Sequence, residues 1–372
     1  MQVLFQNFND IRWQHVVMWL IGALLIYLAI KKDMEPTLLL PMGFGAILVN
    51  IPFTGVLTQG DTLGPLDVLF EAGLELGELF PLLLFIGIGA MIDFGPLLTN
   101  PKLMLFGAAA QFGIFMTLSL AALFGFDIKD AASIGIIGAA DGPTSIFVAQ
   151  TLKSNYTSAI IVAAYSYMAL VPIVQPPVVK LMTTKKERRI KMVYEGKSVP
   201  KLTRICFPIV VTIITGLFAP SAVALVGFLM FGNLIRECGV LDSLSDAAQN
   251  VLAKLITLLL GITVSVTMKG EEFLKWETLL ILGLGLFAFI FDTAAGVLLG
   301  KIMNLFTKKK INPMIGGAGI SAFPMSSRVI HKMGLKEDPQ NFLLMQAAGA
   351  NVSGQVASVI AGGLILSILA SM

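Results

Sequence analysis

The sequence predicts an all-α membrane protein with many spans, and three features of its composition support this fold class. Of the 372 residues, 56% are hydrophobic and only 13% are charged, whereas soluble domains carry about 25% charged residues. The mean hydropathy is +0.84, and long apolar runs recur from one end of the chain to the other. The 36 glycines suit close packing between helices in lipid. We therefore expect a multi-pass protein of the cell membrane, with no nucleic-acid partner.

Twelve apolar elements follow one another along the chain, and each is long enough to form a helix. The first shows no cleavage signal and is predicted to be a retained span. The two cysteines and two histidines offer neither a disulfide framework nor a paired-histidine metal motif. The elements lie at residues 15–30, 38–56, 80–96, 103–124, 131–151, 157–179, 203–218, 221–237, 250–268, 277–300, 313–333 and 341–370.

A basic segment, residues 180–204, divides these elements into two sets. It holds nine lysines or arginines and two acids, so the positive-inside rule assigns it to the cytoplasm. We expect a first membrane repeat at 1–179, a basic cytoplasmic loop at 180–204 and a second membrane repeat at 205–372. The loop is either a docking surface for a partner or a solvated segment that only sets the topology.

Two matched motifs indicate that the halves are internal repeats. GAADGPTS at 138–145 and GISAFPMS at 319–326 share Gly, Pro and Ser at the same relative positions. With the amino terminus outside, the basic loops leave room for about five crossings in each half, so elements 131–151 and 313–333 are predicted to be broken or re-entrant. An odd number of crossings inverts the second half. Inverted repeats whose broken helices meet at the bilayer midplane are typical of a transporter core beside a scaffold.

A single aspartate stands at the centre of the first broken element. Asp141 lies in the apolar stretch GIIGAADGPTSIFVAQ, and a carboxylate near the bilayer midplane costs about 2.5–3.5 kcal/mol on insertion scales. Gly142 and Pro143 follow, and proline cannot continue a helix without freeing backbone groups. The pattern predicts a cation site; the alternative, two merely kinked helices, leaves Asp141 unexplained. Asp93 and Asp292 also lie near membrane depth, where we favour a structural or interfacial role.

The two prolines provide the chemistry for such a site. Pro143 and Pro324 suit the first turn of a helix, where their missing N–H is not needed. Helices that start there direct free N–H groups and a positive dipole end into the site. The unwound residues before them expose carbonyl oxygens, and Thr144, Ser145 and Ser321 add hydroxyls. Oxygen ligands of this kind suit a hard cation such as Na+.

Four further polar residues belong to the same region. Arg328, one turn into the second broken element, either neutralises Asp141 or binds a carboxylate substrate through a bidentate fork. Asn312 and Asn351 are uncharged oxygen donors of the type that ion sites use. Tyr167, in AAYSYMALVP, either relays a proton or packs with one hydrogen bond.

These motifs resemble the beta subunit of the sodium-pumping, biotin-dependent decarboxylases, a family that includes the oxaloacetate, methylmalonyl-CoA and glutaconyl-CoA enzymes. The resemblance covers essentially the whole chain and is sharpest at GAADGPTSIF, AAYSYMALVP, NPMIGGAGISAFPMSSRV and GANVSGQ. No polar position of these motifs departs from the family pattern. The resemblance implies Na+ ligands at Asp141, Asn312 and Asn351, catalytic roles for Tyr167, Ser321 and Arg328, and contacts with carboxybiotin at Arg328, Pro143 and Pro324.

The family resemblance also implies a reaction and its partners. A carboxyltransferase alpha subunit would move CO2 to biotin on a carrier subunit, and this chain would decarboxylate carboxybiotin while Na+ moves outward. Biotin must come from a partner, because the Ala-Met-Lys-Met attachment pattern does not occur in this sequence. We also expect a small accessory membrane subunit and a homo-oligomer.

Two questions of function stay open at this level. The compact length favours an acyl-CoA decarboxylase complex, for glutaconyl-CoA or methylmalonyl-CoA, over the oxaloacetate enzyme. The rival function is a secondary Na+/H+ antiporter or a Na+-solute symporter without decarboxylase chemistry. Inverted repeats, broken helices and a midplane aspartate would serve such a transporter equally well.

Overall fold

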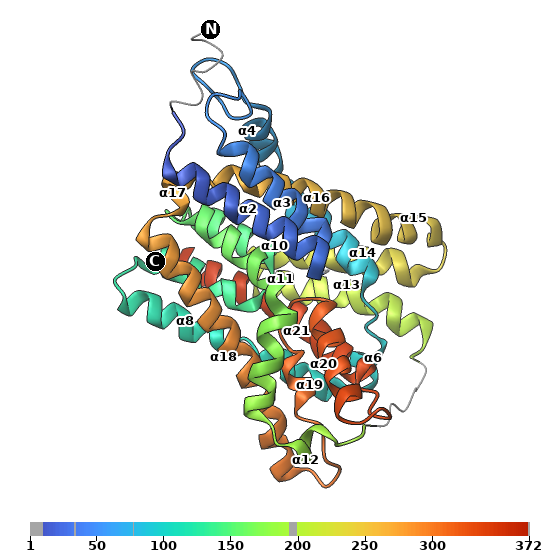
Figure 1. The fold of residues 1–372 in the computed structure, drawn as a ribbon. Helices are drawn as coiled ribbons and strands as arrows, with labels where there is room; N and C mark the ends of the chain where they lie inside the picture. Colours follow the sequence, from blue (N-terminus) through green and yellow to red (C-terminus); the bar gives the residue numbers. More distant parts are fainter. Residues whose placement is uncertain (1–9, 33–34, 77, 193–198, 371–372) are drawn as a thin grey trace.

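The chain folds into a bundle of helices (Figure 1). The computed structural model describes residues 10–32, 35–76, 78–192 and 199–370, and within these ranges it contains no β-sheet. The extended pairing there consists of one isolated bridge, between Gln59 and Thr62. The predicted all-α class is therefore confirmed.

Many of these helices have the length and composition of membrane spans. Seven in the described ranges are long and apolar enough to cross a bilayer, or nine if each of two bent pairs forms one span. The bent pairs are Pro65–Glu75 with Leu79–Met91, and Ala159–Met168 with Leu170–Met182. The seven are Trp13–Lys32 (α2), Pro101–Leu123 (η2, α7 and α8), Lys201–Phe218 (α13), Pro220–Cys238 (η4 and α14), Asp242–Thr267 (α15, η5, α16 and η6), Trp276–Phe306 (α18) and Leu344–Leu369 in α21. The polytopic class is confirmed as well.

The other helices are shorter or interrupted. The basic segment is partly helical, because α11 continues into it as far as Lys180–Met182 and α13 begins at Lys201; its residues 193–198 lie outside the described ranges. In Figure 1, α12 lies at the opposite end of the molecule from α4. The shorter or interrupted helices are α3 (Pro36–Val49), α4 (Pro65–Phe70), α5 (Leu79–Met91), α6 (Gly95–Thr99), α9 (Ile128–Gly135), α10 (Gly142–Thr151), α11 (Thr157–Met182), α12 (Lys185–Arg188), α17 (Gly270–Phe273), α19 (Met314–Gly317) and α20 (Met325–Glu337).

Both predicted broken elements are interrupted, and their breaks touch. In the first, α9 and the 3-10 turn η3 (Ile136–Ala139) end at Ala140, whose φ of 52° is left-handed, and α10 starts afresh at Gly142. In the second, α19 and α20 are separated by residues 318–324. The backbone N–H of Ser321 donates to the carbonyl of Ala139 over 3.0 Å. The inverted orientation of the halves and the three-part division of the chain stay predictions.

The second broken element packs on α18 through glycine. A Cβ atom added at Gly296 of α18 would lie 2.0 Å from the carbonyl oxygen of Gly316, and one added at Gly316 would lie 1.9 Å from that of Gly296. The two backbones are therefore in direct contact, as small residues allow between helices in lipid. This contact holds α19 against the long helix α18.

We expect Gly296→Ala to lower the thermal stability of the purified protein in detergent. The added methyl group must displace the backbone of α19, and overpacking of this kind costs about 1–3 kcal/mol. Gly283→Ala in the same helix is the matched control, because no atom lies within 4 Å of its added methyl group. Equal melting temperatures for the two variants would contradict the close contact.

Candidate functional site

Asp141 begins α10 and is held by four hydrogen bonds. Its Oδ1 accepts from the backbone N–H of Thr144 over 3.4 Å. Its Oδ2 accepts from Thr144 Oγ1 over 2.6 Å, Gln355 Nε2 over 2.9 Å and Ser358 Oγ over 3.0 Å. The residue is only 3% exposed, and no lysine, arginine or histidine of the described chain forms an ion pair with it. All of its partners are neutral, so the carboxylate has donors but no counter-charge.

Gln355 and Ser358 were not among the site residues predicted from the sequence. Together with Asn351 they follow spacings of four and three residues in α21 (Leu344–Ala370), which places all three on one helix face. Polar residues at this spacing in an otherwise apolar span are a readable signal. The structure adds the information that this face points at the first break.

Asn351 lies on this face of α21, where Ser321 of the second break meets the helix. Ser321 Oγ donates to the carbonyl of Gly354 over 2.9 Å, and Asn351 Nδ2 donates to the carbonyl of Ile320 over 2.6 Å. The Oδ1 atom of Asn351 is buried and accepts no hydrogen bond from the described residues. The helix α21 therefore joins both breaks and leaves one amide oxygen available.

Two tyrosines of α11 contact different neighbours. The hydroxyl of Tyr167 donates to the carbonyl of Leu282 in α18, and its ring lies against Gly285. The ring of Tyr165 lies against Gly142, next to Asp141, and its buried hydroxyl has no hydrogen-bond partner among the described residues. Residues two apart in a helix point about 200° apart, so only one of the pair can face the Asp141 turn. Tyr167 is the tyrosine predicted from the sequence, whereas Tyr165 makes this contact.

Arg328 lies in a separate, open cavity. The cavity has a volume of about 390 Å³, and Arg328 is exposed within it beside Lys180 and Lys332. Asp141 does not line this cavity, and the two residues form no ion pair. The reading in which Arg328 neutralises Asp141 therefore does not hold. Pro324 caps α20, which carries Arg328, while Pro143 lies in the first turn of α10, whose start already binds the Asp141 carboxylate.

Asn312 connects α19 to the basic segment. Its Nδ2 donates to the carbonyls of Arg188 and Ile190, each over 2.9 Å, and its Oδ1 accepts from the N–H of Met314 over 3.1 Å. None of these partners is shared with Asp141. The structure therefore brings Ser321 and Asn351 near the Asp141 turn, while Asn312 and Arg328 lie elsewhere.

The basic segment is fastened to the end of α20. Arg188 Nε donates to Glu337 Oε1 over 2.7 Å, and Lys191 Nζ lies 3.2 Å from Asp338 Oδ2. The Arg188 hydrogen bond holds the pKa of the Glu337 carboxyl below its usual range. Glu337 also lines the Arg328 cavity, so the basic segment reaches the rim of that cavity.

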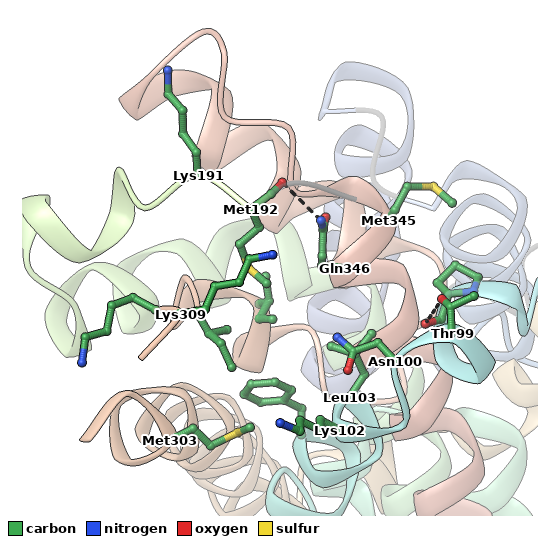
Figure 2. A pocket seen from close by; sticks show the side chains of 15 residues that line it. Thr99, Asn100, Lys102, Leu103, Lys191, Met192, Met303, Lys309, Met345 and Gln346 are labelled. Carbon is green, nitrogen blue, oxygen red and sulfur yellow. Dashed lines mark hydrogen bonds between the residues drawn. The ribbon is translucent and has the colours of Figure 1, made fainter. Parts of the chain in front are cut away.

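A second cavity is lined in part by Lys191 and Met192 of the basic segment (Figure 2). Its volume is about 250 Å³, and four lysines but no acid occur among the described residues that line it. Figure 2 shows Lys102, Lys191 and Lys309 around it from three different segments, with the Lys191 ammonium directed outward. Phe106 also lines the cavity and packs against Gly316 and Gly319 of the second broken element. We call this the lysine cavity (Lys102, Lys191, Lys309, Lys310).

Comparison with known proteins places the chain among decarboxylase subunits. Residues 14–369 match the family described as the Na+-transporting oxaloacetate decarboxylase beta subunit. The chain is 49% identical to the methylmalonyl-CoA decarboxylase subunit beta of Propionigenium modestum, over 97% of this chain and 96% of the relative. It is 50% identical to the glutaconyl-CoA decarboxylase subunit beta of Acidaminococcus fermentans, over 98% and 95%. It is 43% identical to the oxaloacetate decarboxylase beta chain of Klebsiella pneumoniae, over 96% and 95%.

These matches cover almost the full length of this chain and of each relative, and the described helices include at least seven candidate spans. The predicted resemblance is confirmed, and so are the expected location in the membrane and the enzyme class. The chain belongs to the family of beta subunits of Na+-transporting decarboxylases.

Proposed function

We propose that this chain decarboxylates carboxybiotin delivered by a partner subunit and couples that reaction to outward Na+ transport. The observation that carries the proposal is the Asp141 carboxylate, buried at the start of α10 with neutral donors only. A buried carboxylate without a counter-charge is costly in lipid. A Na+ ion supplies that charge, and it accepts the oxygen ligands that surround this turn.

The Na+ site of this proposal centres on Asp141 and includes Asn351. Asn351 contributes its Oδ1 atom, which is buried without a partner in the described chain. Asn312, which the family resemblance adds to the site, is engaged with the basic segment. We therefore assign Asn312 the role of holding the basic segment against α19. Asn312 then acts on the breaks indirectly, through α19.

The carboxyl group of carboxybiotin binds in the Arg328 cavity. Arg328 offers a planar fork that matches a carboxylate, and Lys180 and Lys332 add positive charge beside it. The cavity volume of about 390 Å³ is in the range of small-molecule sites. Pro324 caps α20, whose positive dipole end favours an anion.

The reaction breaks the bond between the carboxyl carbon and a biotin nitrogen, releases CO2 and leaves that nitrogen to take up one proton. Ser321 and Tyr167 are the proposed proton relays. Ser321 lies in the second break; its backbone N–H donates to Ala139 at the first break, and its hydroxyl donates to Gly354 of α21, so movement of the breaks against α21 changes the position of the hydroxyl. When CO2 leaves, the anionic carboxylate of carboxybiotin is lost. This loss changes the electric field at the broken helices and weakens the binding of Na+.

The complex decarboxylates an acyl-CoA, either methylmalonyl-CoA or glutaconyl-CoA. Identity to the beta subunits of those enzymes is 49–50%, against 43% for the oxaloacetate enzyme of Klebsiella pneumoniae. The aligned lengths are 384 and 363 residues for the former and 414 for the latter. A chain of 372 residues therefore has the compact length of the CoA group.

The experiment that tests the function uses the purified complex in proteoliposomes. We expect CO2 release from carboxybiotin to require Na+, and 22Na+ uptake to stop when avidin blocks biotin. Avidin-insensitive 22Na+ flux by this chain without decarboxylation would instead identify a secondary antiporter or symporter.

The biotin carrier docks at the lysine cavity, beside the carboxyltransferase and a small accessory subunit. We expect Lys102→Glu with Lys309→Glu to raise the KM for the carrier roughly tenfold, about 1.4 kcal/mol, and to weaken its salt dependence. Lys269→Glu is the control, since Lys269 is exposed at the start of α17, outside the lysine cavity. An unchanged KM for the double variant would rule out the lysine cavity as the docking site of the carrier.

A further inference from the structure

Gln175 of α11 links the two halves of the second broken element. Its side chain is buried, with the residue 0% exposed. Its Nε2 donates to the carbonyl of Gly317 and to the hydroxyl of Ser326, each over 2.6 Å. Gly317 is the last residue of α19, and Ser326 lies in the first turn of α20. One amide group therefore bridges the break between these two helices.

The hydroxyl of Ser326 completes this bridge. Ser326 Oγ accepts from Gln175 and donates to the carbonyl of Gly317 over 3.2 Å. The last carbonyls of a helix have no partner within that helix, so both donors serve a group that α19 itself leaves unpaired. The three groups form a closed ring of hydrogen bonds between α11, α19 and α20 (Figure 1). We call this ring the Gln175 bridge (Gln175, Gly317, Ser326).

Packing brings the same face of α11 against the second break. Val179 lies four residues after Gln175, so both side chains lie on one face of the helix. A Cβ atom added at Gly317 would lie 3.1 Å from Val179 and 3.4 Å from Ile330 of α20. The helix α11 and both halves of the broken element therefore meet at one point.

The Arg328 cavity lies next to the Gln175 bridge. Pro176 of α11 and Met325 of α20 line this cavity, and each is the chain neighbour of a residue in the bridge. Neither Gln175 nor Ser326 lines the cavity, so the bridge does not contact a ligand there. A ligand that displaces the cavity walls displaces the bridge with them, because the backbone joins each wall residue to its neighbour.

We propose that Gln175 is a positioning residue that makes the second break respond to the contents of the Arg328 cavity. With the bridge intact, α19 and α20 move together when the carboxyl group of carboxybiotin binds or leaves, and Ser321 between them moves too. Without the bridge, the cavity turns over its ligand while the break keeps its position. This inference rests on the proposed coupling of decarboxylation to Na+ transport.

The test measures the 22Na+ taken up per CO2 released by the purified complex in proteoliposomes supplied with carboxybiotin. Gln175→Met keeps the length of the side chain and removes both of its hydrogen bonds in the bridge. The Oε1 atom that is also lost has no hydrogen-bond partner among the described residues. We expect the ratio to fall about tenfold, a usual strength of coupling between two sites, while the KM for carboxybiotin changes less than about twofold.

Ser326→Ala provides a readout that a general loss of stability would not give. It breaks the same bridge on the α20 side and should lower the ratio of 22Na+ to CO2 equally. Because residues of one hydrogen-bond network are not additive, the double variant should lower the ratio no further than either single one.

Gln111→Met is the matched control. Gln111 is also buried, and its Oε1 also has no partner in the described part of the chain. Its Nε2 donates to the carbonyl of Gly107, only four residues earlier in the chain. We expect the wild-type ratio for this variant, and the melting temperature in detergent checks the folding of all four.

The outcomes separate this inference from the proposed function. Wild-type ratios in folded Gln175→Met and Ser326→Ala would overturn the inference and leave the proposed function intact. So would CO2 release and 22Na+ uptake that fall in parallel, or a double variant whose loss is the product of the two single losses. A wild-type complex that releases no CO2 from carboxybiotin would overturn the proposed function and this inference with it. Ser326→Ala decides the question if Gln175→Met does not fold.

Discussion

Asp141→Asn should abolish Na+-dependent decarboxylation of carboxybiotin by the complex. Asparagine keeps the size of the side chain and can still accept from the N–H of Thr144, so the start of α10 is retained. What is lost is the charge that the proposed Na+ ion requires. Removing one partner of a buried charge pair costs about 3–5 kcal/mol, which lowers Na+ affinity by more than about 100-fold.

The measurement is the rate of CO2 release as a function of Na+ concentration, with melting temperature as a check on folding. Asp130→Asn serves as control, because its buried carboxylate is already saturated with hydrogen bonds. A normally folded Asp141→Asn complex that pumps Na+ at the wild-type rate would remove Asp141 from the mechanism.

Arg328→Lys should impair carboxybiotin turnover much more than Na+ binding. Lysine keeps the positive charge in the cavity but loses the planar fork that grips both oxygens of a carboxylate. A hydrogen bond to a charged group contributes about 1.5–3 kcal/mol, so kcat/KM for carboxybiotin should fall roughly 10- to 100-fold. The affinity for 22Na+ should stay unchanged, because Arg328 does not contact Asp141.

Lys332→Gln provides the comparison within the same cavity. Lys332 lines it one turn further along α20, and a single charge without a fork should matter less. We expect its kcat/KM to fall several-fold at most. Equal losses of Na+ affinity and turnover in Arg328→Lys would instead point to a structural role for Arg328.

The broken elements were predictable because their signal is local. Pro143 and Pro324 lack the N–H group that a helix interior needs, and Gly142 with Asp141 offers a start for α10. The structure has both interruptions where these residues stand. The apolar spans were predictable for a similar reason, since the hydropathy of about twenty consecutive residues decides whether a helix can cross lipid.

The partners of Asp141 were not predictable in the same way. Gln355 and Ser358 lie more than two hundred positions further along the chain, and their spacing marks a polar face without saying what it meets. Asn312 and Arg328 sit in motifs as well defined as that of Asp141, yet the structure directs them to the basic segment and to an open cavity.

The sequence by itself determined the helical membrane class, the two interruptions and the family, because each depends on residue type and short-range order. Only the tertiary structure decided which polar groups share a site. Helix packing sets those distances, and packing depends on close contacts such as that between Gly296 and Gly316, which no single stretch of sequence encodes. For that reason Asp292 is an isolated acid in the sequence, whereas in the folded protein it lies next to the first break.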